Sequence, residues 1–301
     1  MSKVVCIGDA CVDIITRKGS SNYTNFSCGG ANANSAYGLG KLNVDVSFVG
    51  MAGNDIYGQK MKDVLTDANV NTDLFLLDEK ESTKILIEID KNNDRFPRLL
   101  TNINPSYLQI KDEQLNKIDL SNTQYILTNG MMLFENPAAS AITSFLEKVH
   151  SLGIKIILDI NYRIETIDKD RQYLDRVIKI SDYLLGSKEE EIIPISNTDN
   201  IDDAVKILVN KNRVIVARNS YGADIYTIDE HIHTDSYPVD VIDTTGAGDA
   251  YNAGFIYGLV NNKSLEQCNK LGCASAAINI KKEGARNTPS EIELIDFINI
   301  N

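Results

Sequence analysis

Residues 243–254 are the part of this 301-residue chain whose types and spacing most clearly suggest chemistry. They read Asp-Thr-Thr-Gly-Ala-Gly-Asp-Ala-Tyr-Asn-Ala-Gly and lie between a strand-like stretch, 237–242, and a helical pattern. A Gly-Ala-Gly turn over 246–248 at the start of a helix would point free backbone N–H groups outward, where the helix dipole favours an anion such as phosphate. Asp249 would lie in the first helical turn as a carboxylate at neutral pH. Beside a bound phosphoryl group, such a carboxylate can accept the proton of an attacking hydroxyl.

The same residues also have a purely structural interpretation, in which the glycines form a tight turn and Asp249 only complements the helix dipole. Two common phosphate-binding motifs are absent. No G-x-x-x-x-G-K-[ST] sequence occurs, and the pattern G-x-G-x-x-G fails at its last position, Tyr251. The residues alone leave a phosphate site and a simple turn both open.

Composition and charge narrow the class of protein. The chain is 43% hydrophobic and 24% charged, with 30 Lys and Arg against 42 Asp and Glu, which gives a net charge of −12. This acidity argues against non-specific binding to nucleic acid or an anionic membrane, although a local pocket could still hold an anion. The five cysteines form no C-x-x-C pair, so neither a disulfide framework nor a zinc site is expected. With no apolar run near the ~18 residues of a membrane span, we expect a cytoplasmic protein.

The elements that must position the 243–254 segment follow an α/β pattern. Strands are predicted at 4–7, 44–49, 125–128, 154–160, 183–185 and 214–217, and helices at 31–41, 58–68, 137–151, 169–180, 202–211, 249–261, 264–279 and 290–299. This alternation favours a mostly parallel sheet covered by helices on both faces.

Residues 72–100 differ in character. The stretches 74–77 and 84–90 are strand-like with no helix between them, and the second one alternates apolar and polar residues. We expect a small antiparallel unit here, joined by residues 12–27, on a single domain spanning 1–301.

Four parts of the sequence, in order along the chain, resemble signatures of the ribokinase-like (pfkB) carbohydrate kinase family. The segment 243–254 resembles the C-terminal signature, and 29–36 resembles the N-terminal pattern G-G-x-x-x-N-x-A. The stretch 48–58 resembles the extension G-x-x-G-x-D-x-x-G, and Gly284-Ala285 before Pro289 resembles the usual ending. The resemblance implies a three-layer αβα fold with a small β-sheet lid, formed here by about 12–27 and 72–104.

The resemblance also implies an enzyme, an ATP-dependent phosphotransferase acting on a sugar-like hydroxyl with ATP and Mg²⁺ and, in many relatives, K⁺. It makes Asp249 the catalytic base and makes Gly246, Ala247 and Gly248 the anion hole for the transferred group. The implied sugar-binding residues are Asp13, Gly29, Gly30 and Asn34. The implied monovalent-cation residues are Asp243 and Thr245.

The nucleotide side departs from the family pattern at two places. The usual N-x-x-E is Ser187-Lys188-Glu189-Glu190 here, in which Glu190 would keep the acid that orders water around Mg²⁺. The usual T-x-G is replaced by Ala217-Arg218-Asn219. We assign Ser187, Glu190, Asn219 and Gly222 to the nucleotide site, with altered affinity or donor preference. The same departures leave open a catalytically silent sugar or nucleotide sensor on this fold.

The acceptor sugar is less clearly specified. The sequence D-x-N-x-R over 159–163 ends a predicted strand, where open α/β sheets bind ligands, and is similar to fructokinases and 2-keto-3-deoxygluconate kinases. Arg163 would contact the sugar, unless it pairs with Glu165 or Asp168. Because 29–34 is closer to the fructokinase form, a ketohexose such as fructose is the first candidate, followed by an acidic keto-sugar, ribose or a nucleoside. The expected partners are sugar and ATP, without nucleic acid or membrane, and the lid strands would permit a homodimer.

Overall fold

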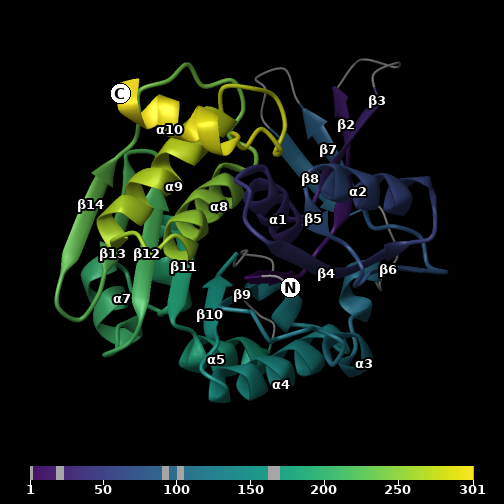
Figure 1. The fold of residues 1–301 in the computed structure, drawn as a ribbon, viewed down its shortest axis with the longest axis horizontal. Coiled ribbons are helices and arrows are strands. Elements are labelled where there is room, and N and C mark those ends of the chain that lie inside the picture. The colour runs from purple at the N-terminus through teal and green to yellow at the C-terminus, as the bar shows by residue number, and fades with distance from the viewer. Residues whose placement is uncertain (1–2, 18–23, 90–94, 100–104, 162–169, 301) are drawn as a thin grey trace.

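The computed structural model describes residues 3–17, 24–89, 95–99, 105–161 and 170–300. Its larger sheet has the strand order β14-β13-β12-β11-β10-β9-β1-β4-β5, with β6 paired to β4 (Figure 1). The strands are β1 (Val4–Ile7), β4 (Val46–Gly53), β5 (Val70–Asn71), β6 (Phe75–Asp78), β9 (Tyr125–Asn129), β10 (Lys155–Asp159), β11 (Tyr183–Ser187), β12 (Val214–Asn219), β13 (Gly222–Tyr226) and β14 (His231–Asp235). All neighbours from β5 to β12 run parallel, and only β13 and β14 are antiparallel. The predicted mostly parallel sheet is confirmed.

Helices cover both faces of this sheet, as its apolar strands require. One face carries α1 (Ala31–Lys41), α2 (Ile56–Asp67), α8 (Ala247–Val260), α9 (Leu265–Asn279) and α10 (Glu291–Ile300). The other carries α3 (Asp112–Leu115), α4 (Ala138–Ser151), α5 (Gln172–Ile180), α6 (Ile193–Ile195) and α7 (Ile201–Leu208). Short turns lie at η1 (Ser106–Gln109), η2 (Gly130–Leu133) and η4 (Lys188–Ile192). The three-layer arrangement agrees with the sequence prediction.

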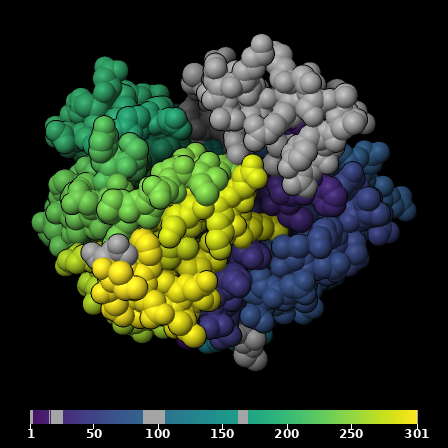
Figure 2. All heavy atoms as spheres, turned by 90° about the horizontal axis from the view of Figure 1, so that it is seen from above, coloured from purple at the N-terminus to yellow at the C-terminus, as the bar shows by residue number. Residues whose placement is uncertain are grey.

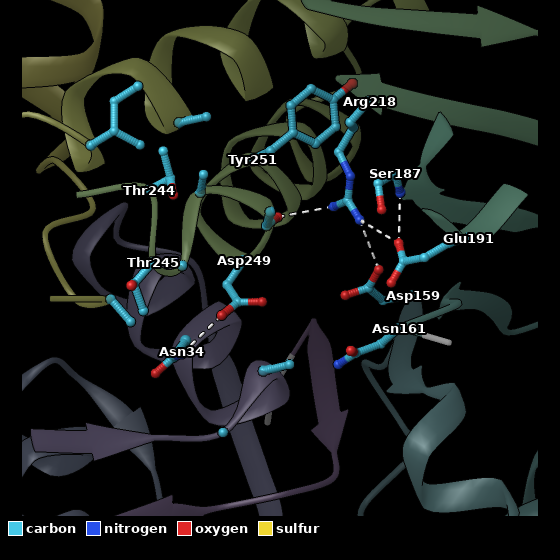
Figure 3. Close-up of a pocket in the computed structure, with 18 of the residues that line it drawn as sticks. Asn34, Asp159, Asn161, Ser187, Glu191, Arg218, Thr244, Thr245, Asp249 and Tyr251 are labelled. Carbon is cyan, nitrogen blue, oxygen red and sulfur yellow. Dashed lines mark hydrogen bonds and ion pairs between the residues drawn. The ribbon is translucent and has the colours of Figure 1, made fainter. Parts of the chain in front are cut away.

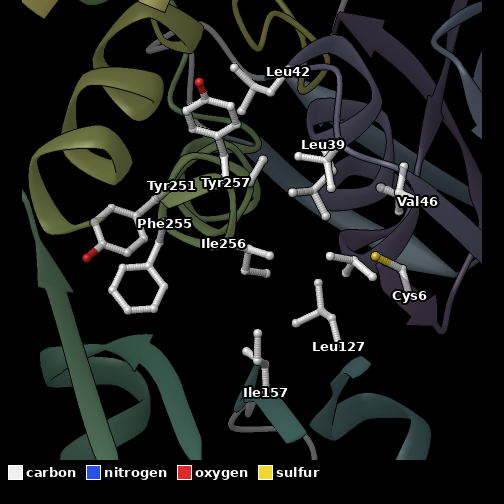
Figure 4. Packing of buried hydrophobic residues seen from close by; sticks show 14 of the residues in the cluster. Cys6, Leu39, Leu42, Val46, Leu127, Ile157, Tyr251, Phe255, Ile256 and Tyr257 are labelled. Carbon is white, nitrogen blue, oxygen red and sulfur yellow. The ribbon is translucent and has the colours of Figure 1, made fainter. Parts of the chain in front are cut away.

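The packing of α1 against α8 brings opposite ends of the chain together. Leu39 of α1 and Ile256 of α8 share one buried cluster with Leu127 and Ile157 of the strands beneath them (Figure 4). From above, the yellow C-terminal segments lie beside the purple N-terminal residues (Figure 2). The two predicted signature segments therefore meet above the centre of the sheet.

A separate small sheet lies beside the N-terminal half of the larger one (Figure 1). Its order is β3-β2-β7-β8, from β3 (Thr24–Gly29), β2 (Cys11–Arg17), β7 (Lys84–Ile89) and β8 (Arg95–Leu99). The predicted joining of the 12–27 stretch to this unit is confirmed for its described residues, 12–17 and 24–27, but β2 and β7 run parallel rather than antiparallel. The prediction that 74–77 belongs to this unit is wrong, since β6 pairs with β4 and Phe75 is fully buried against Phe48.

The predicted strand at 237–242 is also wrong. These residues form no regular element between β14 and α8, and Val241 and Ile242 are exposed. The apolar alternation resembled a strand, but Pro238 has no N–H to give to a ladder. Within the part of the chain that the structure describes, no helix is both long and apolar enough to cross a bilayer.

Candidate active site

A cleft of about 1050 Å³ opens at the carboxyl ends of the parallel strands. Asp9 follows β1, Asp159 ends β10, Ser187 ends β11 and Arg218 lies near the end of β12; all four line the cleft. Strand β1 has β4 on one side and β9 on the other, so the chain order reverses beside it. Such a switch point is where open α/β sheets bind their ligands.

The loop before α8 places backbone donors at the floor of this cleft. Gly246 has φ +74°, and a Cβ atom there would lie 2.6 Å from the carbonyl oxygen of Ala285, so only glycine fits. The N–H of Ala247 is used within the loop, where it donates to Thr244 O at 3.1 Å. The N–H groups of Gly246, Gly248 and Asp249 have no acceptor among the described residues. The geometry fits an anion, bound by these three amides rather than by Ala247.

Asp249 lies in the first turn of α8 and is held from α1. Its Oδ2 accepts a hydrogen bond from Asn34 Nδ2 at 2.8 Å (Figure 3). Burial raises the pKa of Asp249 to about 8, and Asp159 and Asp9 add to the shift against the opposing effects of Asn34 and Arg218. This differs from the expected carboxylate at neutral pH, because burial outweighs the hydrogen bond from Asn34 and none of the described backbone N–H groups donates to this side chain.

Arg218 links the base to the acidic strand ends and was not predicted as a site residue. Its guanidinium donates to Gly248 O at 3.0 Å, to Asp159 Oδ1 at 3.0 Å and to Asn252 Oδ1, and it lies 3.8 Å from Glu191 (Figure 3). Asn252 Nδ2 donates to the second oxygen of Asp159 at 3.0 Å. Arg218, a half-buried cation on β12, thus connects the first turn of α8 to the end of β10 and to η4.

The acid beside Ser187 is Glu191, not the predicted Glu190. Glu191 lines the cleft and accepts from Ser187 N at 2.6 Å, whereas Glu190 is exposed and does not line it. The cause is the wide π-type turn η4, in which the third glutamate of the run, rather than the second, points to the cleft. Burial, with the charge of Asp159, raises the pKa of Glu191, and Arg218 opposes the shift.

Three of the predicted sugar-binding residues, Asp13, Gly30 and Asn34, line the cleft. Gly29 lies behind them, where a Cβ atom would come within 2.6 Å of Asp13 Oδ2. Ile85 and Ile87 of the small sheet complete this side. Arg163 lies outside the described residues.

Asp9, which the sequence did not single out, caps the start of α1. Its carboxylate accepts from Ala31 N at 2.9 Å, Asn32 N at 3.2 Å and Asn129 Nδ2 at 2.7 Å. It therefore fixes the helix that presents Asn34.

The predicted nucleotide residues Ser187, Asn219 and Gly222 line the other half of the cleft. The lining also includes apolar side chains, those of Tyr237, Val241, Ala276, Ala277 and Ile280. A mostly apolar lining with a few polar groups is typical of sites that bind small organic ligands.

The two predicted cation residues tie the loop together. Asp243 Oδ1 accepts from Thr245 N at 2.9 Å and Thr245 Oγ1 at 2.7 Å, and its Oδ2 accepts from Gly284 N at 2.8 Å. Among the residues with described positions, no three His, Cys, Asp or Glu side chains are grouped to hold a metal ion.

A strand-end cleft in which helix amides without an acceptor among the described residues lie beside a half-buried acid is typical of the phosphoryl-transfer enzymes of open α/β folds. The family model described as pfkB family carbohydrate kinase matches residues 1–292, and the chain belongs to this family. It is a sugar kinase, a phosphotransferase whose acceptor is an alcohol group.

Individual relatives agree with this assignment. The chain is 28% identical to a 5-dehydro-2-deoxygluconokinase from Photobacterium profundum, over 98% of this chain and 94% of the relative. An Escherichia coli protein described as a ribokinase II, solved with ATP and Mg²⁺, has a TM-score of 0.89 at 22% identity over 100% of both chains. A Vibrio cholerae fructokinase double mutant, solved with fructose, ADP and potassium, has a TM-score of 0.86 at 21% identity over 99% of both chains. At these identities the two structures establish the fold.

Proposed function

We propose that this protein transfers the γ-phosphoryl group of ATP to a hydroxyl of a keto-sugar acid similar to 5-dehydro-2-deoxygluconate. The observation that carries the proposal is the set of three backbone N–H groups, of Gly246, Gly248 and Asp249, that have no acceptor among the described residues and lie beside the half-buried Asp249 carboxyl. The acceptor class is supported by the relatives, since other relatives at 24–26% identity share the name of the Photobacterium protein.

Each side of the cleft has a role in this reaction. Asp13 and Asn34 would hold sugar hydroxyls, and Asp249 would take the proton of the attacking hydroxyl. The amides of Gly246 and Gly248 would stabilise the negative charge on the transferring group, since they need no reorganisation to face it.

The nucleotide half of the cleft fits MgATP. Tyr237, Val241 and Ile280 offer an apolar surface to the base, and Asn219 lies where phosphates would pass. The carboxylate of Glu191 supplies the hard oxygen that Mg²⁺ prefers, directly or through water. When bound, Mg²⁺ neutralises phosphate charge. K⁺ near Asp243 and Thr245 remains part of the proposal, suggested by the potassium-bound fructokinase.

Fructose is the second candidate acceptor. The Gly-Gly-Ala-Asn-Ala-Asn sequence over 29–34 favours it, and fructokinases share the fold. The names of the relatives favour the acid, because they match at higher identity than the fructokinase structure.

A coupled ADP-release assay with MgATP and potassium tests both candidates. The acceptors are 5-dehydro-2-deoxygluconate, 2-keto-3-deoxygluconate, fructose, ribose and adenosine. We expect the highest kcat/KM with the first of these. A higher kcat/KM with fructose would make fructose the acceptor and leave the assignment as a kinase intact. ADP release that does not depend on sugar, or no ADP release with any acceptor, would contradict the proposal.

The pH dependence of kcat/KM should show the raised pKa of Asp249. Because the base acts when deprotonated, the rate should rise with pH, about tenfold per unit below the pKa, and level off above about pH 8. The measurement is kcat/KM of the free enzyme between pH 5.5 and 9.5. A profile already flat at pH 6 would show that Asp249 is ionised there and would contradict this assignment.

Gly246→Ala should displace the backbone N–H groups of Gly246, Gly248 and Asp249 from their anion-binding positions. A Cβ atom at φ +74° would meet the Ala285 backbone, so the loop must move and its amides with it. We expect a loss of at least about 1–2 kcal/mol in unfolding free energy from the left-handed conformation alone, together with a fall in kcat. The matched control is Gly153→Ala, which also has a positive φ but meets no atom within 4 Å and lies outside the cleft. It should lose stability only, and equal kcat values for both variants would contradict the assigned role of the loop.

A further inference from the structure

The side-chain amide of Asn34 is held from two sides, and this fixes its orientation. Its Nδ2 donates to Asp249 Oδ2 at 2.8 Å, and its Oδ1 accepts from Arg286 Nε at 2.9 Å. A guanidinium can only donate, so the Asn34 atom facing Arg286 must be the oxygen. The atom facing Asp249 must then be the NH₂ group. The three residues form a chain of hydrogen bonds with a single polarity.

Arg286 lies in the segment between α9 and α10 and is partly buried. Its Nη2 donates to Gly29 O at 3.3 Å, and the guanidinium lies over the Tyr37 ring, 5.7 Å from its centre. Its Nη1 is buried without a partner among the described residues. Burial lowers the pKa of Arg286, while Cys28, Cys11, Tyr37 and Asp13 oppose the shift.

This arrangement is unfavourable for a residue with only a structural role. A buried donor without an acceptor costs free energy, and none of the described carboxylates forms an ion pair with this guanidinium. Arg213 shows the contrast, since its guanidinium donates to the carbonyls of Ser181, Leu208, Ile178 and Lys179.

We propose that Arg286 is a positioning residue for phosphoryl transfer, which locks the Asn34 amide so that only a donor faces the base. The inference rests on the proposed function, in which Asp249 is that base. A protonated Asp249 could donate to Asn34 only if the amide turned its oxygen toward it. That turn would set an N–H of Asn34 against the Nε–H of Arg286. With the amide fixed, Asn34 can only donate to Asp249, and this hydrogen bond is stronger to a carboxylate than to the neutral oxygen of the protonated acid. Arg286 therefore favours the carboxylate of Asp249.

The other charged groups around Asp249 show why the orientation of the Asn34 amide matters. Asp9 after β1 and Asp159 at the end of β10 favour the proton, and Arg218 on β12 opposes it. Asn34 is the one described side chain that hydrogen-bonds the Asp249 carboxyl. The direction of its amide thus decides which protonation state it stabilises.

The test is a titration of the unliganded protein carrying ¹³Cγ-labelled aspartate, followed by NMR between pH 6 and 10. In the wild type, a signal titrating near pH 8 should be absent from Asp249→Asn, which assigns it. In Arg286→Met we expect its midpoint to rise by about one pH unit, the value of one hydrogen bond to a charged group. Arg286→Lys, which keeps a donor, should shift it less. An unchanged or lower midpoint in Arg286→Met would overturn the proposal.

Two further measurements separate positioning from scaffolding. Arg286→Met should keep or raise the melting temperature, whereas Arg213→Met should lower it without moving the midpoint. In an Asn34→Leu background, Arg286→Met should add no shift, because the effect passes through Asn34. An equal shift in that background would also overturn the proposal. Since the titration needs neither sugar nor ATP, its result is independent of whether the proposed reaction occurs.

Discussion

Asp249→Asn is expected to lower kcat by about 10²- to 10⁴-fold, the range for loss of a general base. The amide has the shape of the acid, and Asn34 Nδ2 can still donate to its oxygen, so the cleft should keep its geometry. An amide cannot accept the proton of the attacking hydroxyl. Sugar binding should stay within a few-fold of the wild type, which isothermal titration with the preferred sugar would measure.

The same substitution should make the protein more stable than the wild type at high pH. Because the pKa of Asp249 is raised from 3.8 to about 8, the folded wild type holds a proton that the unfolded chain releases across this range. The wild type therefore loses stability as pH rises from 3.8 to about 8, and the asparagine variant does not. Urea unfolding at pH 6 and pH 8 should show the variant gaining relative to the wild type. Asp240→Asn, at an exposed position outside the cleft, is the matched control and should change neither quantity.

Arg218→Met should have the largest effect on stability. It removes the cation between Asp159 and Glu191, and it leaves Gly248 O and Asn252 without their donor. Breaking one side of a buried ion pair costs about 3–5 kcal/mol, because the remaining charge is left uncompensated. Turnover should fall as well, since the first turn of α8 loses its tie to β10.

An exposed ion pair and a charge-neutral triple variant are the controls for Arg218→Met. Arg176→Met removes an ion pair with Glu147 whose side chains are 43% and 40% exposed, and it should cost at most about 1 kcal/mol. Adding Asp159→Asn and Glu191→Gln to Arg218→Met should recover part of the lost stability, because no unpaired charge then remains. Urea denaturation measures all of these variants. A loss for Arg218→Met no larger than that for Arg176→Met would contradict the buried network.

Much of this architecture could be predicted from the sequence, because its strands are buried on both faces. Strand β1 is buried at all four positions, so it is a continuous apolar run in the sequence. The 243–254 segment was predictable for another reason. Two glycines one residue apart, followed at once by an acid at the start of a helix, are a specific combination. The site residues that were missed act through contacts between distant segments. Arg218 is 59 residues from Asp159, and Arg286 is 252 residues from Asn34.

Other errors came from local ambiguity. The N-x-x-E spacing selected Glu190 among three consecutive glutamates, 189–191, but the π-type turn η4 places Glu191 at the cleft instead. The motif at 48–58 was a correct family signature, but the geometry gives its Asp55 a structural task. Asp55 accepts from Tyr57 N, Gly58 N and Ser82 Oγ at 2.6–3.0 Å and so caps α2. A matching motif therefore identified the family without every position belonging to the site.

The most direct test of the central claim is to follow the γ-phosphoryl group itself. In ³¹P NMR with MgATP and the preferred sugar, the wild type should convert the γ-phosphate signal of ATP into a sugar phosphomonoester. Asp249→Asn should leave that signal in place over the same time, with sugar binding retained. Comparable transfer by the variant, or release of inorganic phosphate by the wild type with or without sugar, would contradict Asp249 as the base of a sugar kinase.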